Sequence, residues 1–248
     1  MTPGARVSAA ISILDKVLEG DPVNKVLLNW FRNNRFAGSR DRFTIREIVF
    51  ICLRFRWSSL WSFNYCGFPD TGRSLVLGAS NRTDCFDLKC FDGARFSPAA
   101  LSEKEEYVIR LFNKILEEAP ISVQLDHPAF LEQLFRDSLG QDYEPILKCL
   151  NSRAKIFLRV NLLRCSFNEV VEVLKHEKII VEKCSNVSNG LLVLRPLNNL
   201  QQLDVFKSGK VEIQDISSQA VVDFINPREG IEILDYCVGS GGKTLAMA

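Results

Sequence analysis

Hydrophobic residues recur every three to four positions through the first part of the chain, which is the spacing of amphipathic helices. The first run ends at Gly20, the second begins at Asp21 and Pro22, and the third follows Gly38. Each break carries a residue that commonly ends or starts a helix. Residues 1–150 are therefore predicted to form a compact all-α helical bundle.

Later helices of the bundle are marked by their starts. Ser102 and Glu105 have the spacing of a capping box, so they predict the first turn of a long helix. Shorter helices are predicted over residues 73–78, from about Asp126 onward, and over residues 145–150.

The period of the pattern changes to two in the next segment, residues 151–211, where apolar and polar residues alternate. Ser166 and Glu169 predict a second capping box, with a helix after it. Strands are predicted over residues 156–162, 179–182 and 191–194. This order predicts a small β-α-β-β module.

The last segment, residues 212–248, begins with a short strand and a helix for which Ser217 or Ser218 is the expected N-cap. The apolar run 231–234 is then expected to form a strand, followed by a glycine-rich turn and a new helix. A strand that enters a helix through glycines is how α/β proteins cradle nucleotide-like ligands, because glycine lets backbone N–H groups approach the ligand.

Several interpretations of this turn, CVGSGGKT, are open. A phosphate-binding P-loop needs glycine where Cys237 stands, and a dinucleotide-binding turn needs glycine where Thr244 stands. The remaining interpretations are a turn without a ligand and a site for a methionine-derived cofactor.

The segments QDISSQ and LDYCVGSGGKT together resemble the Sun/Fmu family of RNA cytosine-5 methyltransferases, whose first cofactor motif reads roughly LD-x-C-A-A-P-G-G-K-T. The order of segments also resembles the RsmB-like members, which act on 16S ribosomal RNA. The resemblance implies a multi-domain chain: a NusB-like RNA-binding bundle over 1–150, a small α/β module over 151–211, and the truncated start of a Rossmann-like α/β methyltransferase domain over 212–248.

The resemblance also implies S-adenosylmethionine as cofactor. Its methionine part would be held by Cys237, Val238, Gly239, Ser240, Gly241, Gly242 and Lys243. Asp235 would orient the loop. The family's catalytic cysteines lie in Pro-Cys and Thr-Cys motifs that these 248 residues lack, so no catalytic residue is assigned and the fragment is expected to be inactive by itself. The alternatives are a stand-alone NusB-type RNA-binding module and a P-loop nucleotide hydrolase.

Charge is distributed unevenly, although the whole chain has a net charge of only +1. Residues 32–56 contain seven arginines against Asp41 and Glu47, whereas residues 101–150 are strongly acidic. Because arginine pairs well with phosphate, we expect the first cluster to contact RNA. The expected contacts are Arg32, Arg35, Arg40, Arg42 and Arg46. Phe36 and Phe43 lie between them. Stacking on an RNA base is one interpretation of these rings, and packing of both in the core is the preferred one.

Other classes of site have little support. The eight cysteines and two histidines are scattered without metal-ligand spacing, so we expect free, buried thiols and no metal. No apolar run is long enough to span a membrane and no secretion signal is evident, so a cytoplasmic monomer without membrane contact is expected.

Overall fold

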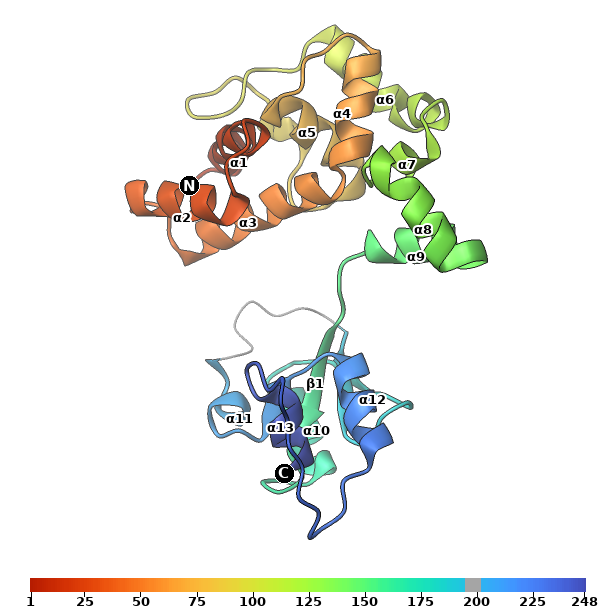
Figure 1. Ribbon diagram of the computed structural model, residues 1–248. Coiled ribbons are helices and arrows are strands. Elements are labelled where there is room, and N and C mark those ends of the chain that lie inside the picture. The colour runs from red at the N-terminus through yellow and green to blue at the C-terminus, as the bar shows by residue number, and fades with distance from the viewer. Residues whose placement is uncertain (195–201) are drawn as a thin grey trace. The chain divides into compact units, whose positions relative to one another are not determined.

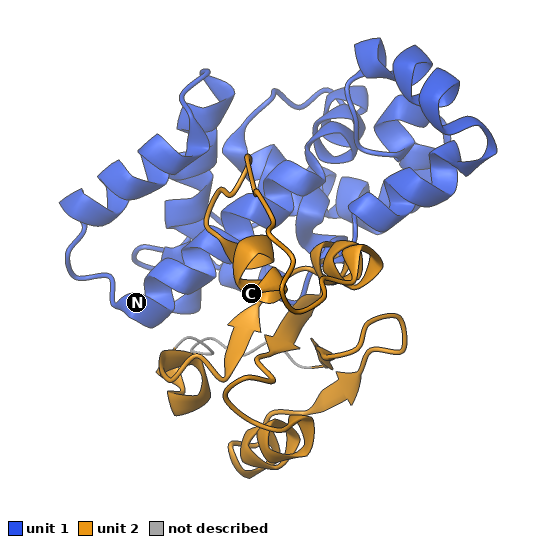
Figure 2. Cartoon of the chain, turned by 60° about the horizontal axis from the view of Figure 1, so that its bottom comes forward, with its two compact units in different colours: residues 1–152 blue, residues 153–248 orange. Residues whose placement is uncertain are grey.

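The computed structural model describes residues 1–194 and 202–248. These residues form two compact units, residues 1–152 and residues 153–248, which are coloured separately in Figure 2. Each unit has its own hydrophobic core.

The first unit is helical throughout, as the sequence predicted. Its α-helices, drawn from red to green in Figure 1, are α1 (Pro3–Leu18), α2 (Val23–Asn33), α3 (Ser39–Arg54), α4 (Arg56–Tyr65), α5 (Gly72–Ala79), α6 (Glu103–Glu117), α7 (Ile121–Gln124), α8 (Glu132–Leu139) and α9 (Tyr143–Leu150). Short 3-10 turns are formed by η1 (Ser80–Arg82), η2 (Leu88–Cys90), η3 (Ala129–Leu131) and η4 (Gly140–Asp142).

Helix α1 packs against α2, α3 and α5. Its fully buried residues are Val7, Ala10, Ile13 and Leu14. Helix α5 begins directly on α1, because the N–H of Gly72 donates to Oδ1 of Asp15 at 2.6 Å. A Cβ at position 72 would lie 2.3 Å from the carbonyl oxygen of Ile11, so only glycine fits at this contact.

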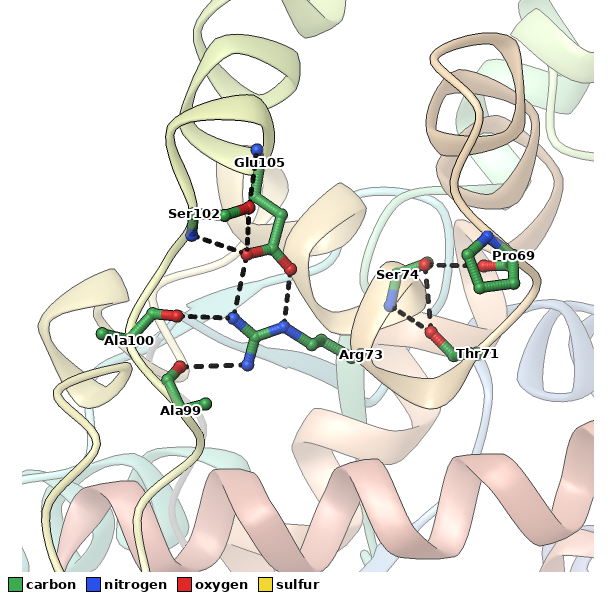
Figure 3. Close-up of polar contacts among 8 residues, drawn as sticks. All are labelled: Pro69, Thr71, Arg73, Ser74, Ala99, Ala100, Ser102 and Glu105. Carbon is green, nitrogen blue, oxygen red and sulfur yellow. Dashed lines mark hydrogen bonds and ion pairs between the residues drawn. The ribbon is translucent and has the colours of Figure 1, made fainter.

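The predicted capping box at the start of α6 is confirmed. Ser102 accepts from the N–H of Glu105, and the Glu105 carboxylate accepts from the N–H of Ser102 at 2.8 Å. The same carboxylate receives the guanidinium of Arg73 from α5, with Nε 2.6 Å from Oε1 (Figure 3). Arg73 also donates to the carbonyls of Ala99 and Ala100. These bonds link α5, the preceding loop and the first turn of α6.

Helix α4 was not predicted. It follows α3 after the single residue Phe55, and its buried face carries Ser58, Ser59 and Ser62, so it has no regular apolar stripe. The small side chain of Ser59 allows a close approach to α5, where a Cβ at Gly78 would lie 2.4 Å from the Cβ of Ser59.

The helix expected from about Asp126 begins later. Asp126 itself has a positive φ of 56°, which breaks a right-handed helix, and the chain passes through η3 before α8 starts. Phe130 and Leu134, two large apolar residues of this region, are 77% and 61% exposed.

The second unit contains the predicted small sheet. Its elements are β1 (Ile156–Val160), α10 (Phe167–His176), β2 (Val181–Lys183), β3 (Gly190–Val193), α11 (Asp204–Lys207), β4 (Val211–Ile213), α12 (Ile216–Ile225) and α13 (Gly242–Met247). The strand order is β2-β3-β1-β4, and every pair is antiparallel. Strand β4 therefore joins the sheet of the small module, although the sequence placed it in the third segment. Leu162 lies beyond the end of β1 and is 58% exposed.

Alternate residues of β1 face a core shared with α10. The buried side chains of this core include Leu158, Val160, Val170, Leu174, Leu191, Val193 and Val211. Ser166 caps α10 as predicted, but the reciprocal half of the box does not form because Glu169 instead pairs with Lys210 at 2.7 Å. The N-cap of α12 is Asp215 rather than Ser217 or Ser218, since its carboxylate accepts from the N–H of Ser217.

The strand expected over 231–234 does not form. Ile231 and Leu234 are 56% and 87% exposed. A strand needs a neighbour for its backbone groups, and no strand among the described residues pairs with this segment. Among the described residues, no helix is long and apolar enough to cross a membrane.

Candidate functional site

Four of the five arginines expected to contact RNA surround one pocket at the junction of α2 and α3. Arg32 comes from the last turn of α2, Arg35 from the connecting loop, and Arg42 and Arg46 from α3. The pocket has a volume of about 800 Å³, and its remaining lining residues are Leu28, Phe31, Ser39 and Phe43. The fifth arginine, Arg40, is exposed but does not line it. We call this pocket and its four arginines the arginine face.

The arginines of this face differ in how they are held. Arg42 is fixed, because its Nε–H donates to the carbonyl of Ala37 at 2.8 Å and its guanidinium lies 5.6 Å from the centre of the Phe31 ring. Arg32, Arg35 and Arg46 are exposed, and none of them forms an ion pair with a carboxylate in the described parts of the chain. Three cationic groups are therefore available to an anionic ligand.

Asp41, one of the two acidic residues in this part of the sequence, does not neutralise this face. Asp41 is largely buried and its carboxylate accepts from Nε of Arg6 at 2.8 Å and from the N-terminal ammonium at 3.3 Å. The hydrogen bond from Arg6 is the main cause that holds the pKa of Asp41 below its usual range. Asp41 is thus already paired with cations away from the pocket, and the positive charge of the arginine face is left uncompensated by it.

The expectation that Phe36 and Phe43 pack in the core is wrong. Phe36 is 71% exposed and makes an edge contact with Trp30, while Phe43 is 38% exposed at the rim of the pocket. The sequence analysis also missed Phe50 and Trp57, which are each 38% exposed. The signal that marks them is the constant spacing of seven residues between positions 36, 43, 50 and 57.

The expected cofactor loop lies in the second unit, on the exposed approach to α13. Cys237 to Ser240 and Lys243 are exposed, and Gly241 and Gly242 are half-buried. Gly239 and Gly241 have φ values of 54° and 84°, a left-handed conformation that favours glycine. The loop closes through a bond from the N–H of Gly241 to the carbonyl of Val238 at 2.8 Å.

Asp235 holds this loop against the helix that follows. Its Oδ2 accepts from Oγ1 of Thr244 at 2.6 Å, which ties the start of the loop to the first turn of α13. Position 242 lies close to the QDISSQ segment, since a Cβ at Gly242 would be 3.6 Å from Nε2 of Gln214. The two parts of the sequence that carry the family resemblance are therefore neighbours in the folded chain.

The candidate groups for acid–base or thiol chemistry are placed as follows. His127 is buried, with Nε2 bonded to the hydroxyl of Tyr143 at 2.6 Å and Nδ1 to the carbonyl of Pro128 at 2.9 Å. His176 is exposed at the end of α10. The described cysteines are all free, but only Cys52 and Cys165 are buried, so the expectation of buried thiols holds for these two alone. Cys149 and Cys237 are exposed, and the remaining four are half-buried.

Comparison with known proteins identifies one part of the chain directly. Residues 127–199 match the model of the Methyltr_RsmF/B-like, ferredoxin-like domain. This region of the chain is thus similar to the ferredoxin-like domain of RsmF/B-like methyltransferases. This match confirms the family resemblance that the sequence motifs indicated, and it covers the β1-to-β3 region of the antiparallel sheet.

Curated relatives agree with this assignment. The chain is 33% identical over 118 residues to the ribosomal RNA small subunit methyltransferase B of Yersinia pseudotuberculosis serotype O:1b, a match that covers 48% of the chain and 27% of that protein. It is 29% identical over 118 residues to the protein of the same name from Vibrio vulnificus, covering 48% of the chain and 28% of the relative. The match thus spans just over a quarter of the length of these relatives.

Among solved structures, the crystal structure of PH0851 aligns with the whole chain. The TM-score is 0.61 at 18% sequence identity, and the alignment covers 100% of this chain and 60% of that one. This similarity supports the fold of the chain.

Proposed function

We propose that this chain is part of an S-adenosylmethionine-dependent methyltransferase that modifies cytosine C5 in ribosomal RNA. The RsmF/B-like domain and the names of the curated relatives support the reaction class. The motif residues around Gly239 and the QDISSQ segment support the cofactor and the cytosine-5 position, because they carry the resemblance to the Sun/Fmu family. On this proposal, the protein acts in the cytoplasm as a monomer, with 16S ribosomal RNA as its partner.

In this proposal, the first unit is a NusB-like bundle that binds RNA through the arginine face. One observation carries this step: Arg32, Arg35 and Arg46 converge on one pocket, and Asp41 is turned away and paired elsewhere. Such an arrangement suits phosphate groups, because guanidinium ions donate two parallel hydrogen bonds to them. The neighbouring Arg42 is held by Ala37 and shapes the pocket wall.

The second unit contributes the start of the cofactor site, which on this proposal begins a Rossmann-like domain over 212–248. Residues 237–243 would hold the methionine part of S-adenosylmethionine, which supplies the transferable methyl group when bound. The loop fits such a ligand in one respect: apart from the two adjacent residues, nothing lies within 4 Å of where a Cβ on Gly241 would be, so the backbone is open to an approaching group. The bond between Asp235 and Thr244 keeps the loop in place.

The 248-residue chain by itself is expected to bind RNA without methylating it. It has no Pro-Cys or Thr-Cys dipeptide, in which the family places its cysteines. Transfer of labelled methyl groups to cytosine by the pure chain would contradict this prediction.

The alternative of an RNA-binding module without catalysis is favoured by one observation, the complete arginine face within the first unit. Detection of Pro-Cys and Thr-Cys motifs downstream in the same reading frame would decide against that alternative.

The RNA-binding step is tested by the salt dependence of affinity for a fragment of 16S ribosomal RNA. Replacing Arg32, Arg35 and Arg46 together by alanine should lower the slope of log K against log salt by about 2, since each single-strand phosphate contact contributes roughly 0.7. A matched control removes three exposed cations elsewhere in the unit, with the substitutions Lys89→Ala, Arg110→Ala and Lys114→Ala. The control should retain the slope of the unmodified chain. Equal slopes in both variants would refute the proposal.

A further inference from the structure

Helix α3 carries aromatic residues on the face that points away from its core. The buried positions of this helix are Asp41, Ile45, Ile48, Val49 and Cys52. At about 100° per residue, Phe43 and Phe50 lie on the opposite side of the helix, and Arg46 and Arg54 lie with them. Both phenylalanines are 38% exposed. A solvent face normally carries polar residues, so two aromatic rings at its centre need an explanation.

The pattern extends beyond α3. Phe36 precedes the helix and Trp57 follows it, and both are exposed. Within the helix, Phe43 and Phe50 are about 10.5 Å apart along the axis, from seven residues at 1.5 Å each. The guanidinium of Arg56 lies 5.5 Å from the centre of the Trp57 ring. We call these four exposed residues, at positions 36, 43, 50 and 57, the aromatic track.

The aromatic track lies in the most basic part of the chain. Residues 32–56 contain seven arginines and two acidic residues, one of which, Asp41, is paired with Arg6. Flat apolar rings between cationic groups match the two parts of a single-stranded nucleic acid, since bases stack on rings while phosphates contact arginines. In a duplex the bases are already stacked on each other, and the rings would have no free base face to cover.

We propose that the aromatic track binds unpaired RNA bases, so that the first unit selects single-stranded over double-stranded RNA. This inference rests on the proposed RNA-binding function of the arginine face and adds the class of RNA that it accepts. The arginines supply affinity that depends on salt, whereas the rings supply the preference for unpaired bases.

The test measures binding of the full chain to two probes labelled with a fluorophore: a single-stranded 12-nucleotide RNA and the same sequence in a blunt duplex. The variant Phe43→Ala/Phe50→Ala should bind the single strand at least about 25-fold more weakly, from roughly fivefold for each lost stacking contact. Its affinity for the duplex and its salt slope should stay unchanged. Phe43→Trp/Phe50→Trp should keep single-strand binding, and Phe43→Leu/Phe50→Leu, which keeps apolar area without a ring, should lose it. The control Phe130→Ala removes an exposed ring from η3 and should change neither affinity.

The outcomes separate this inference from the proposal on which it rests. If the arginine variant lowers the salt slope while the alanine and leucine variants bind both probes normally, the arginine face binds RNA and the aromatic track does not. Equal loss for both probes would also overturn the inference. If the unmodified chain binds neither probe at any salt concentration, both proposals fail. A change of association state in the alanine variant would show that the rings serve contact between proteins instead.

Discussion

Asp126 offers a quantitative test of the packing in the first unit. Asp126 lies just before η3, and its buried carboxylate contacts Ser58 of α4. It accepts hydrogen bonds from the N–H and from the hydroxyl of Ser58, both at 2.8 Å. Nη1 of Arg82 lies 3.5 Å away. Burial outweighs these favourable contacts and raises the pKa of Asp126 from 3.8 to about 6. The protonated form is therefore more stable relative to the ionised form in the folded protein than in the unfolded chain.

The sign of the effect on stability follows from this shift. Because the folded-state pKa lies above the unfolded value, the contribution of Asp126 to folding is fully present below about pH 4. It is lost as the pH rises through about 6. A pKa shift of about two units changes the free energy of unfolding by about 3 kcal/mol between low pH, where Asp126 is protonated in both states, and high pH, where it is ionised in both.

The substitution Asp126→Asn should remove this dependence. Asparagine can accept from the N–H of Ser58 and donate to its hydroxyl oxygen, and it tolerates the positive φ of 56° at this position. The free energy of unfolding of the variant, minus that of the unmodified chain, should therefore rise by about 2 kcal/mol between pH 4 and pH 7, which is most of the full effect.

Urea unfolding followed by tryptophan fluorescence measures this difference, because the three tryptophans (Trp30, Trp57 and Trp61) all lie in the first unit. Asp137→Asn, at an exposed carboxylate on α8, is the matched control and should show no comparable change. A difference that stays flat with pH would contradict the reasoning. A difference that falls toward neutral pH would show that the contacts with Ser58 and Arg82 outweigh burial.

Two further predictions concern packing and the C-terminal segment. Gly72→Ala should lower the melting temperature by several degrees, because the added Cβ would lie 2.3 Å from the Ile11 carbonyl oxygen. Gly20→Ala is the comparison: position 20 has a positive φ but open space around it, so this variant reports the effect of backbone strain without a collision. Deletion of residues 230–248 should leave the melting temperature unchanged and improve solubility, since most apolar side chains of the segment are exposed. A drop of several degrees after the deletion would show that α13 and its contact with α12 stabilise the second unit.

Local signals were sufficient for much of the fold. Ser102 and Glu105 predicted the start of α6, because both halves of a capping box act within one turn. The alternating residues from Ile156 predicted β1 and its buried face. In each case the residues that determine the structure are neighbours in sequence.

The failures have a common cause, which is dependence on distant partners. Helix α4 has serines on its buried face, and the close approach of one of them, Ser59, to Gly78 on α5 is not visible in a periodic pattern. The run 231–234 has strand-like residues, but strand formation also requires pairing that the described residues do not provide. Glu169 completes no capping box because Lys210, 41 residues away, takes its carboxylate.

The candidate site was predicted in composition but not in arrangement. The arginine cluster is evident from residue counts. Which of its members line the pocket depends on how α3 is rotated about its axis, because this rotation places Arg42 and Arg46 at the pocket and leaves Arg40 outside. The exposure of Phe36 and Phe43 was not predicted, because an aromatic residue is more often buried than exposed. Helix phase and partner contacts together determine which members of a cluster can act jointly.

The central claim is that RNA lies on the α2–α3 surface of a chain related to RsmF/B-like methyltransferases. The most direct measurement is photochemical cross-linking of the pure chain to a 16S ribosomal RNA fragment that contains 4-thiouridine, followed by mass spectrometry of the cross-linked peptides. The account predicts cross-links concentrated in residues 32–57, with loss of most of them in the Arg32, Arg35 and Arg46 alanine variant. Cross-links confined to residues 153–248, or unchanged by that variant, would contradict it.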